Sequence, residues 1–203
     1  MNRWTYRIQP TVLHKPFKPC DKERFENWLS CFDQEDPRLH ITPQQFRWKP
    51  IQFPTEDKKV NFIEGIITMG GAGGPAMKDG LAILVYACNA NMEKEAFYSS
   101  DGDMLIVPQH GALLVKTEFG RMRVEPLEIC VIQRGIKFSI DVLEGKSRGY
   151  ITEVYKGHFV IPDLGPIGSN GLANPRDFEI PVAWFEDVVE KWRIVNKFQG
   201  KFF

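Results

Sequence analysis

The sequence predicts a mainly β fold, a jelly-roll type of β-sandwich or barrel, and three observations support this prediction. Short apolar or alternating segments follow one another at roughly 8–12-residue spacing, as the strands of such folds do. Glycine and proline are plentiful, with 17 and 14 among 203 residues, which favours many turns. Helical periodicity is clear in only one short segment. A chain of this length is expected to fold as one domain whose core needs no disulfide or metal.

Residues 1–60 are expected to form an irregular arm, because prolines interrupt them and leave room only for short elements. The interrupting residues are Pro10, Pro16, Pro19, Pro37, Pro43, Pro50 and Pro54. One short helix is predicted over residues 21–32, with Asp21 as its N-cap. Its apolar face would consist of residues spaced i, i+3, i+4 and i+7, which are Phe25, Trp28, Leu29 and Phe32.

Residues 60–156 are predicted to form the β core. Residues 81–88 are continuously apolar, which is typical of a strand buried on both faces. Residues 136–142 alternate instead, so one face of that strand should be core and the other wet. Further strands are expected at residues 104–107, 112–117 and 121–125.

Residues 157–203 return to loop, since prolines and glycines are dense between Pro162 and Pro181. A short helical turn near residues 183–189 and a final strand near residues 192–198 complete the prediction. A loop of this length is usually functional or docked on a partner.

Composition excludes several classes of protein. The 26 Lys and Arg residues balance 26 Asp and Glu, which gives no cationic surface for nucleic acid. The longest apolar run is far shorter than the roughly 20 residues of a membrane span, and the N-terminus has no signal-peptide pattern. The four cysteines form no C-x-x-C pair, and Cys88 and Cys130 lie in apolar strands as reduced core residues. A cytoplasmic location is therefore expected.

Two groups of residues could carry chemistry but lack the required pattern. Gly70, Gly71, Gly73 and Gly74 are followed by Pro75 and Ala76 in place of Lys-Ser/Thr, so a flexible loop is favoured over a phosphate-binding loop. His14, His40, His110 and His158 lie too far apart in sequence to form a local metal pair, and surface roles are favoured.

The acidic stretch Asp101-Gly102-Asp103 is compatible with a cation site or a tight turn, and the turn is favoured.

The strand pattern is similar to that of the cupin barrel, whose two motifs supply metal-binding histidines. Placing Asp103 at the acidic position and Gly111 near the closing glycine puts the first two histidine positions at Ala96 and Tyr98, or at Phe97 and Ser99. In the second motif, Phe138 stands where the third histidine would be. The sequence therefore predicts a degenerate cupin-like barrel with a filled core and no metal-binding, cofactor-binding or catalytic residues.

Long stretches of the chain resemble one particular family. They include Trp48-Lys49-Pro50, Ser100-Asp101-Gly102-Asp103, Leu105-Ile106-Val107-Pro108-Gln109, Thr117-Glu118-Phe119-Gly120, Arg148-Gly149-Tyr150 and Pro162-Asp163-Leu164-Gly165-Pro166-Ile167-Gly168. The resemblance is to the N-terminal part of the homogentisate 1,2-dioxygenases, and it covers nearly the whole chain.

The resemblance implies that residues 1–203 are one N-terminal structural and assembly domain. Enzymes of this family cleave homogentisate with O₂ at a non-haem Fe(II), giving maleylacetoacetate in tyrosine and phenylalanine catabolism. Their iron ligands belong to a C-terminal domain that is absent here, so no Fe(II) is expected on this chain. The implied partners are that C-terminal domain and neighbouring subunits of a hexamer, with the loop over residues 162–178 packing on one of them.

Two other functions stay open at this point. The chain could be a free-standing, non-catalytic cupin-like module that binds a small molecule. It could also be an enzyme with a novel site around Asp101, Asp103 and His110.

Overall fold

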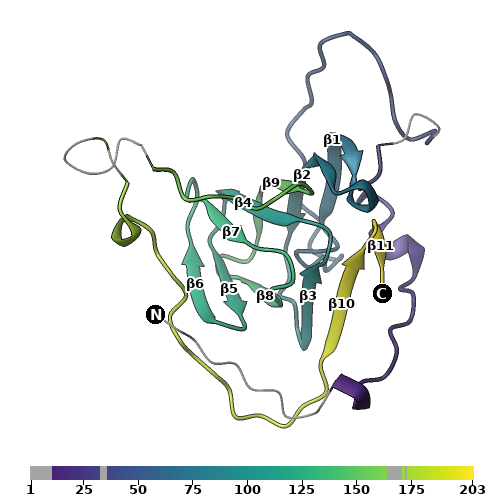
Figure 1. Ribbon diagram of the computed structural model, residues 1–203. Helices are drawn as coiled ribbons and strands as arrows, with labels where there is room; N and C mark the ends of the chain where they lie inside the picture. The colour runs from purple at the N-terminus through teal and green to yellow at the C-terminus, as the bar shows by residue number, and fades with distance from the viewer. Residues whose placement is uncertain (1–10, 33–35, 164–170, 172) are drawn as a thin grey trace.

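The computed structural model describes residues 11–32, 36–163, 171 and 173–203, and these form two β-sheets packed face to face (Figure 1). The five-stranded sheet has the order β1 (Ile66–Gly74), β2 (Asp79–Cys88), β9 (Ser147–Val154), β4 (Asp103–His110) and β7 (Cys130–Ile132). The six-stranded sheet has the order β11 (Lys201–Phe202), β10 (Arg193–Phe198), β3 (Glu95–Ser99), β8 (Phe138–Val142), β5 (Leu113–Thr117) and β6 (Gly120–Val124). The predicted mainly β fold is confirmed.

Strand pairing links the ends of the sequence to its middle. Neighbouring strands are antiparallel except for β10 and β3, which run parallel with Val195 opposite Phe97. The final strand predicted near residues 192–198 is therefore confirmed, and it lies inside the six-stranded sheet. The strands predicted within residues 81–142 are also confirmed, as β2, β4, β5, β6 and β8.

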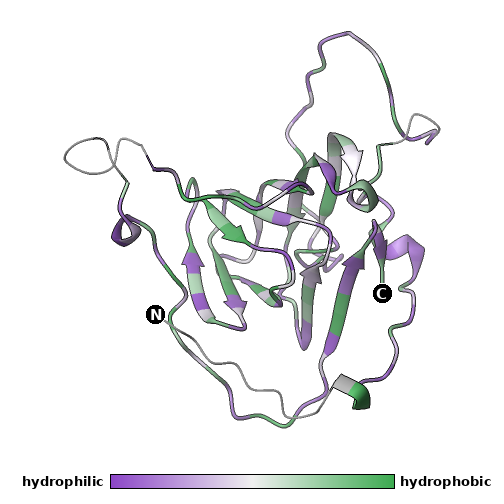
Figure 2. Ribbon diagram, viewed as in Figure 1, coloured by the Kyte–Doolittle hydropathy of each residue, from purple (hydrophilic) through white to green (hydrophobic). Residues whose placement is uncertain are grey.

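The core lies between the sheets and contains a cluster of aromatic rings. Phe97 and Phe138 are opposite each other on β3 and β8, with their ring centroids 5.5 Å apart. Phe62 packs against Tyr86 at 4.7 Å, and Trp28 from the arm packs against Phe97 at 5.4 Å. In Figure 2 strands of the six-stranded sheet, such as β6 and β10, alternate between polar and apolar residues, as strands with one inner face do.

The helix predicted over residues 21–32 is wrong. Helical structure among the described residues is limited to short 3-10 segments: η1 (Thr11–Leu13), η2 (Lys22–Phe25), η3 (Pro75–Met77) and η4 (Pro175–Asp177). Phe25 and Trp28 are buried as expected. Beyond them, however, the Leu29 amide donates to Thr68 Oγ1 and the Phe32 amide donates to the Gly73 carbonyl. These bonds to β1 replace helical ones and hold the chain extended.

The glycine-rich stretch is also not a flexible loop, because it forms the second half of β1. Gly71 is opposite Ala82 in the β1–β2 register. A Cβ atom on Gly71 would lie 2.2 Å from the Phe32 ring and 2.6 Å from the Leu81 carbonyl oxygen. Glycine is needed here because the arm approaches the strand backbone closely.

The helical turn predicted near residues 183–189 is wrong as well. Val182 forms an antiparallel bridge with Arg121 of β6, with N–O distances of 2.8 and 2.9 Å in the two directions. The Arg121 guanidinium packs on the Trp184 ring and pairs with Glu186 at 2.9 Å. Pairing with the edge strand keeps this segment extended across the outside of the six-stranded sheet.

Burial of β2 on both faces is a fourth prediction that the described chain does not meet. Leu84 and Tyr86 on the inner face are fully buried, but Leu81 and Ile83 on the outer face are 37% and 48% exposed. The outer side of β2 is therefore partly open to solvent at these two residues.

Candidate functional site

The interior of the sandwich holds the positions where cupin ligands would stand. On β3, Phe97 and Ser99 are buried whereas Ala96 and Tyr98 are partly exposed, so the first pair faces the interior. Phe138 faces the same interior from β8 and is 2% exposed. Two phenyl rings and a hydroxyl therefore occupy these positions, and the predicted packing of Phe138 in the core is confirmed.

A buried lysine lies beside Ser99 and brings its own positive charge into the interior. The Lys197 ammonium on β10 is 2.9 Å from Asp101 Oδ2 and 2.9 Å from both carboxylate oxygens of Glu153 on β9. All three side chains are 2% exposed or less. Ser99 Oγ donates to Glu153 at 2.8 Å. The Trp28 and Tyr155 rings flank the ammonium at 5.6 and 5.5 Å.

This interior does not fit an iron ion. The Lys197 charge would repel a metal cation, and the two would compete for the same carboxylate oxygens. Neither phenyl ring offers a ligand atom. Across the described ranges, no group of three or more His, Cys, Asp and Glu side chains is arranged to hold a metal. That the chain binds no iron stays a prediction.

The two acidic residues of the β3–β4 turn serve different loops. Asp101 accepts hydrogen bonds from the Gln199 and Gly200 amides at 2.6 and 2.9 Å. Asp103 is fully buried and accepts from the Arg134 amide at 2.9 Å and the Phe159 amide at 3.0 Å. Each carboxylate fixes a separate segment, which supports the tight-turn interpretation over a shared cation site.

The histidines do not converge. His14 and His40 are exposed on the arm, and His110 is exposed at the far end of β4, with its ring 5.3 Å from Phe53. His110 is thus separated from Asp103 by the length of a strand, about 23 Å. The site proposed from Asp101, Asp103 and His110 is not assembled.

His158 contacts a buried carboxylate, and no pattern in the sequence predicts this contact. Its Nδ1 lies 3.0 Å from Asp103 Oδ1, across 55 positions of sequence. The contact depends on the loop after β9 returning to the start of β4, which no local pattern predicts.

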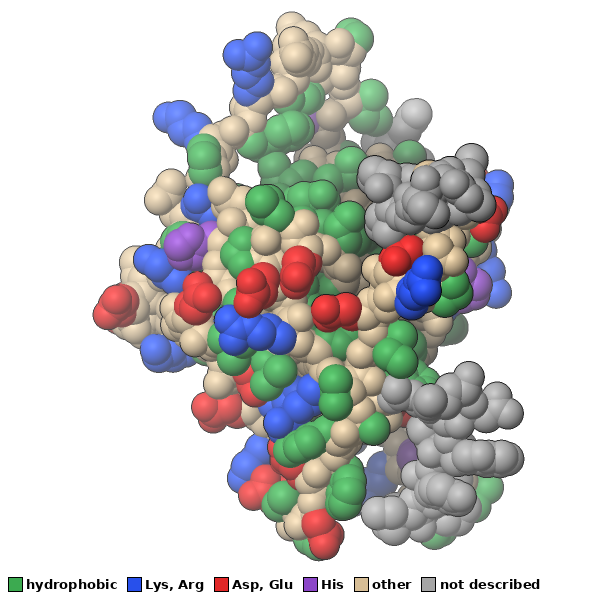
Figure 3. Space-filling model, turned by 90° about the vertical axis from the view of Figure 1, so that its left-hand side faces the viewer, with side chains coloured by type: hydrophobic (Ala, Val, Ile, Leu, Met, Phe, Trp, Pro, Cys, Tyr) green, Lys and Arg blue, Asp and Glu red, His purple; other side chains and the backbone are tan. Residues whose placement is uncertain are grey.

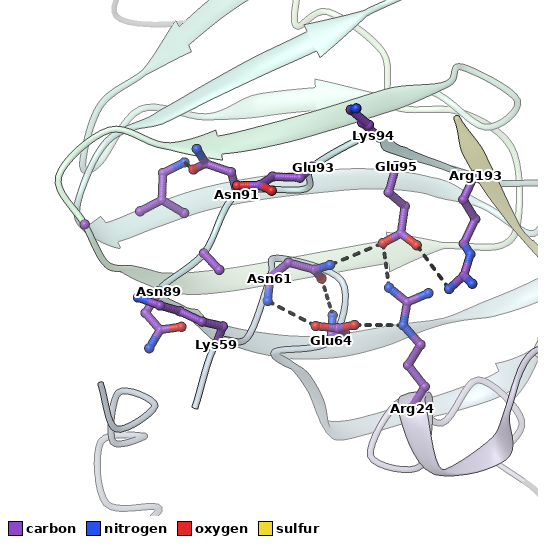
Figure 4. A pocket seen from close by; sticks show the side chains of 13 residues that line it. Arg24, Lys59, Asn61, Glu64, Asn89, Asn91, Glu93, Lys94, Glu95 and Arg193 are labelled. Carbon is purple, nitrogen blue, oxygen red and sulfur yellow. Dashed lines mark hydrogen bonds and ion pairs between the residues drawn. The ribbon is translucent and has the colours of Figure 1, made fainter. Parts of the chain in front are cut away.

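A polar pocket of about 670 Å³ opens at one end of the sandwich (Figure 4). At its wall, Arg24 Nε donates to Glu64 at 2.8 Å and Arg24 Nη2 donates to Glu95 at 2.6 Å. Burial disfavours the charged guanidinium of Arg24, but the hydrogen bonds to Glu95 and Glu64 more than offset this and raise its pKa. Asn61 adds a bond to Glu95 at 3.2 Å. Because Glu95 is held by Arg24 and Asn61, it is not positioned as a free general base.

The four cysteines, all within the described residues, are free thiols. Cys88 and Cys130 are buried as predicted, and burial raises the pKa of each thiol to about 12. Cys31 is exposed.

We expect iodoacetamide at pH 8 to label Cys31 rapidly in the folded chain and to leave Cys88 and Cys130 unlabelled. The reactive species is the thiolate, and burial suppresses it at the two core positions. Peptide mass spectrometry before and after urea unfolding measures the labelling. Comparable rates at Cys31 and Cys88 without urea would contradict the expectation.

Comparison with known proteins adds to this geometry. The family model for the homogentisate 1,2-dioxygenase N-terminal domain matches residues 1–203. The chain belongs to this family. It is 54% identical to homogentisate 1,2-dioxygenase of Drosophila melanogaster and 55% identical to that of Homo sapiens. These matches cover 100% and 98% of the chain.

The dioxygenase relatives are much longer than this chain. It spans 45% of the Drosophila protein and 44% of the human protein, which is less than half of either. Among solved structures, it is similar to a cupin superfamily protein from Desulfitobacterium hafniense, with a TM-score of 0.40 and 12% identity over 59% of this chain and 99% of that one.

The family-specific loop over residues 162–178 lies partly outside the described residues, which omit 164–170 and 172. In the described part, the Ala173 amide donates to the Asp163 carbonyl at 3.1 Å, and Asn174 and Asp177 cap η4 reciprocally. Its packing on a partner stays a prediction. In the part of the chain that the structure describes, no helix is long and apolar enough to cross a membrane.

Proposed function

We propose that this chain is the non-catalytic N-terminal domain of a homogentisate 1,2-dioxygenase and that its role is to support the catalytic part. The observation that carries the proposal is the filled interior of a domain that matches the family from end to end. Phe97 and Phe138, at positions where the cupin motifs would have histidines, and the buried Lys197 ammonium fill this interior.

The activity would belong to the longer polypeptide. Fe(II), held by residues outside this chain, would supply the O₂ chemistry that cleaves homogentisate to maleylacetoacetate in tyrosine and phenylalanine catabolism. This domain would contribute contacts to the C-terminal domain and to neighbouring subunits of an oligomer. A cytosolic location is part of the same proposal.

The test compares the chain alone with the chain co-expressed with the C-terminal part of the Drosophila relative. We expect the isolated chain to contain no stoichiometric iron and to consume no O₂ with homogentisate. The paired sample should contain iron and be active. Elemental analysis and an oxygen electrode measure both quantities. Iron and turnover in the chain alone would contradict the proposal.

A second candidate, a free-standing binding module, is favoured by the polar pocket. Arg24 Nη1 is buried beside it and has no hydrogen-bond partner within the described residues. If the pocket serves a small ligand, the isolated chain should bind it without any C-terminal part. A reading frame that continues into an iron-binding half would exclude this candidate.

A further inference from the structure

The outer face of the five-stranded sheet is apolar where a sandwich normally shows polar residues. Residues opposite each other in the register share this face, and two central rows cross the strands between a row that contains Asp103 and a row that contains Arg148 and His110. One row contains Ile83, Thr152, Leu105 and Val131, and the other contains Ile67, Val85, Tyr150 and Val107. Neither row contains a charged residue. We call these eight residues the outer apolar face.

Much of this face is open to solvent in the described chain. Ile83 is 48% exposed, Tyr150 46% and Val131 39%. Figure 3 shows hydrophobic side chains gathered in the upper centre of one side of the molecule, with charged side chains mostly around and below them. An exposed apolar patch on a β-sheet face can mark an interaction site.

The arm already covers one end of the face. Arg148 lies two residues before Tyr150 on β9, on the same face of the sheet, and donates from Nη1 to the Ile51 carbonyl at 3.0 Å. Its guanidinium lies 4.9 Å from the Phe53 ring centroid. Beside this contact Val107 is only 6% exposed, whereas Ile83 further along the sheet is open. The cover supplied by the described chain therefore ends part-way across.

The sequence of β2 indicates that the outer side of this strand is covered as well. Residues 81–88 have the continuous apolar pattern of a strand buried on both sides, and the described chain buries only the inner side completely. A charge-free centre of this sort suits a permanent partner more than a transient one, because obligate interfaces resemble a domain core cut in half.

We propose that the outer apolar face is the docking surface for the C-terminal part of the homogentisate 1,2-dioxygenase polypeptide. This rests on the proposed function. More than half of each relative's length lies outside the region that this chain matches, so a permanent, covalently linked partner of sufficient size is available. Covalent linkage gives it an effective concentration that a second copy of this chain does not have. The docking element should present its own apolar strands or helix face about 10 Å above the sheet.

Site-specific photo-crosslinking tests the assignment. Benzoylphenylalanine is placed at Tyr150 or Ile83 in the chain, which is then co-expressed with the C-terminal part of the Drosophila relative. Met77, which is 82% exposed at the β1–β2 turn, is the matched control position. We expect irradiation to link positions 83 and 150 to the C-terminal part and to leave position 77 unlinked.

A binding measurement gives a second readout. Ile83→Glu should weaken the affinity of the chain for the C-terminal part by roughly 100-fold, because it buries an unpaired charge. Met77→Glu should leave the affinity unchanged. Circular dichroism of both variants checks that the chain is still folded.

The outcomes separate this inference from the proposed function. Crosslinks from positions 83 and 150 to a second copy of the chain, or an active pair in which Ile83→Glu binds normally, would overturn the docking surface alone. Failure of the unsubstituted pair to associate would overturn the docking surface, and the absence of iron and turnover in that pair would count separately against the proposed function.

Discussion

Replacing Lys197 by methionine should lower the free energy of unfolding of this domain by about 3–5 kcal/mol. The ammonium is fully buried and makes three hydrogen bonds to the carboxylates of Asp101 and Glu153. Methionine has a similar length but no charge, so it would leave two carboxylates in the interior without a cation. Urea unfolding followed by tryptophan fluorescence measures the change, since Trp28 packs beside the site.

Lys116→Met is the matched control for this experiment. Lys116 also pairs with a carboxylate, Asp141, at 2.8 Å, but both side chains are more than a fifth exposed. The same substitution there should cost only about 0–1 kcal/mol. Adding Glu153→Gln to Lys197→Met should recover part of the loss, because it removes one of the stranded charges. Equal losses at Lys197 and Lys116 would show that burial of the ion cluster is not what matters.

Phe138→Ala should destabilise the domain by about 3–5 kcal/mol, because it opens a cavity at the centre of the aromatic cluster. The ring is 2% exposed and packs edge-on against Phe97 at 5.5 Å and against Phe62 at 6.4 Å. Phe138→Leu should cost less, since it refills part of the space. Urea unfolding measures both variants.

The control for this series is Phe185→Ala, at a phenylalanine that is 84% exposed on the extended segment after Val182. That variant should change the stability of the chain by no more than about 0.5 kcal/mol. If Phe138→Ala were as mild as the control, the interior would have room for a ligand after all, and the filled-core interpretation would be wrong.

The predictions from sequence succeeded where a local pattern has one solution. Alternation over residues 136–142 gave β8, and the apolar run over residues 81–88 gave β2. They failed where the backbone amides can form hydrogen bonds either within a helix or to a neighbouring strand. The residues after Trp28 have a helical apolar spacing, yet their amides bond to Thr68 and Gly73 on β1. Apolar side chains at i, i+3 and i+4 can be buried without a helix when a neighbouring strand supplies the hydrogen bonds.

The candidate site shows the same division. The cupin motifs, aligned along β3 and β8, predicted that Phe138 would fill the core. The absence of the motif's histidine at this position can be recognised from this sequence alone. The Lys197 cluster was not predicted, because its partners lie 44 and 96 positions away in sequence. It forms only when β10 joins the six-stranded sheet beside β3 and faces β9 across the interior.

The sequence by itself therefore determined the mainly β class, the core residues of most strands and the family. These features can be recognised from local patterns and contiguous motifs. Only the tertiary structure decided that the Lys197 ammonium is buried between the carboxylates of Asp101 and Glu153 and that one sheet carries a partly exposed apolar face. Both depend on which strands become neighbours and which layer covers them. Those are long-range choices made by burial and hydrogen bonding over the whole domain, and no window of sequence contains them.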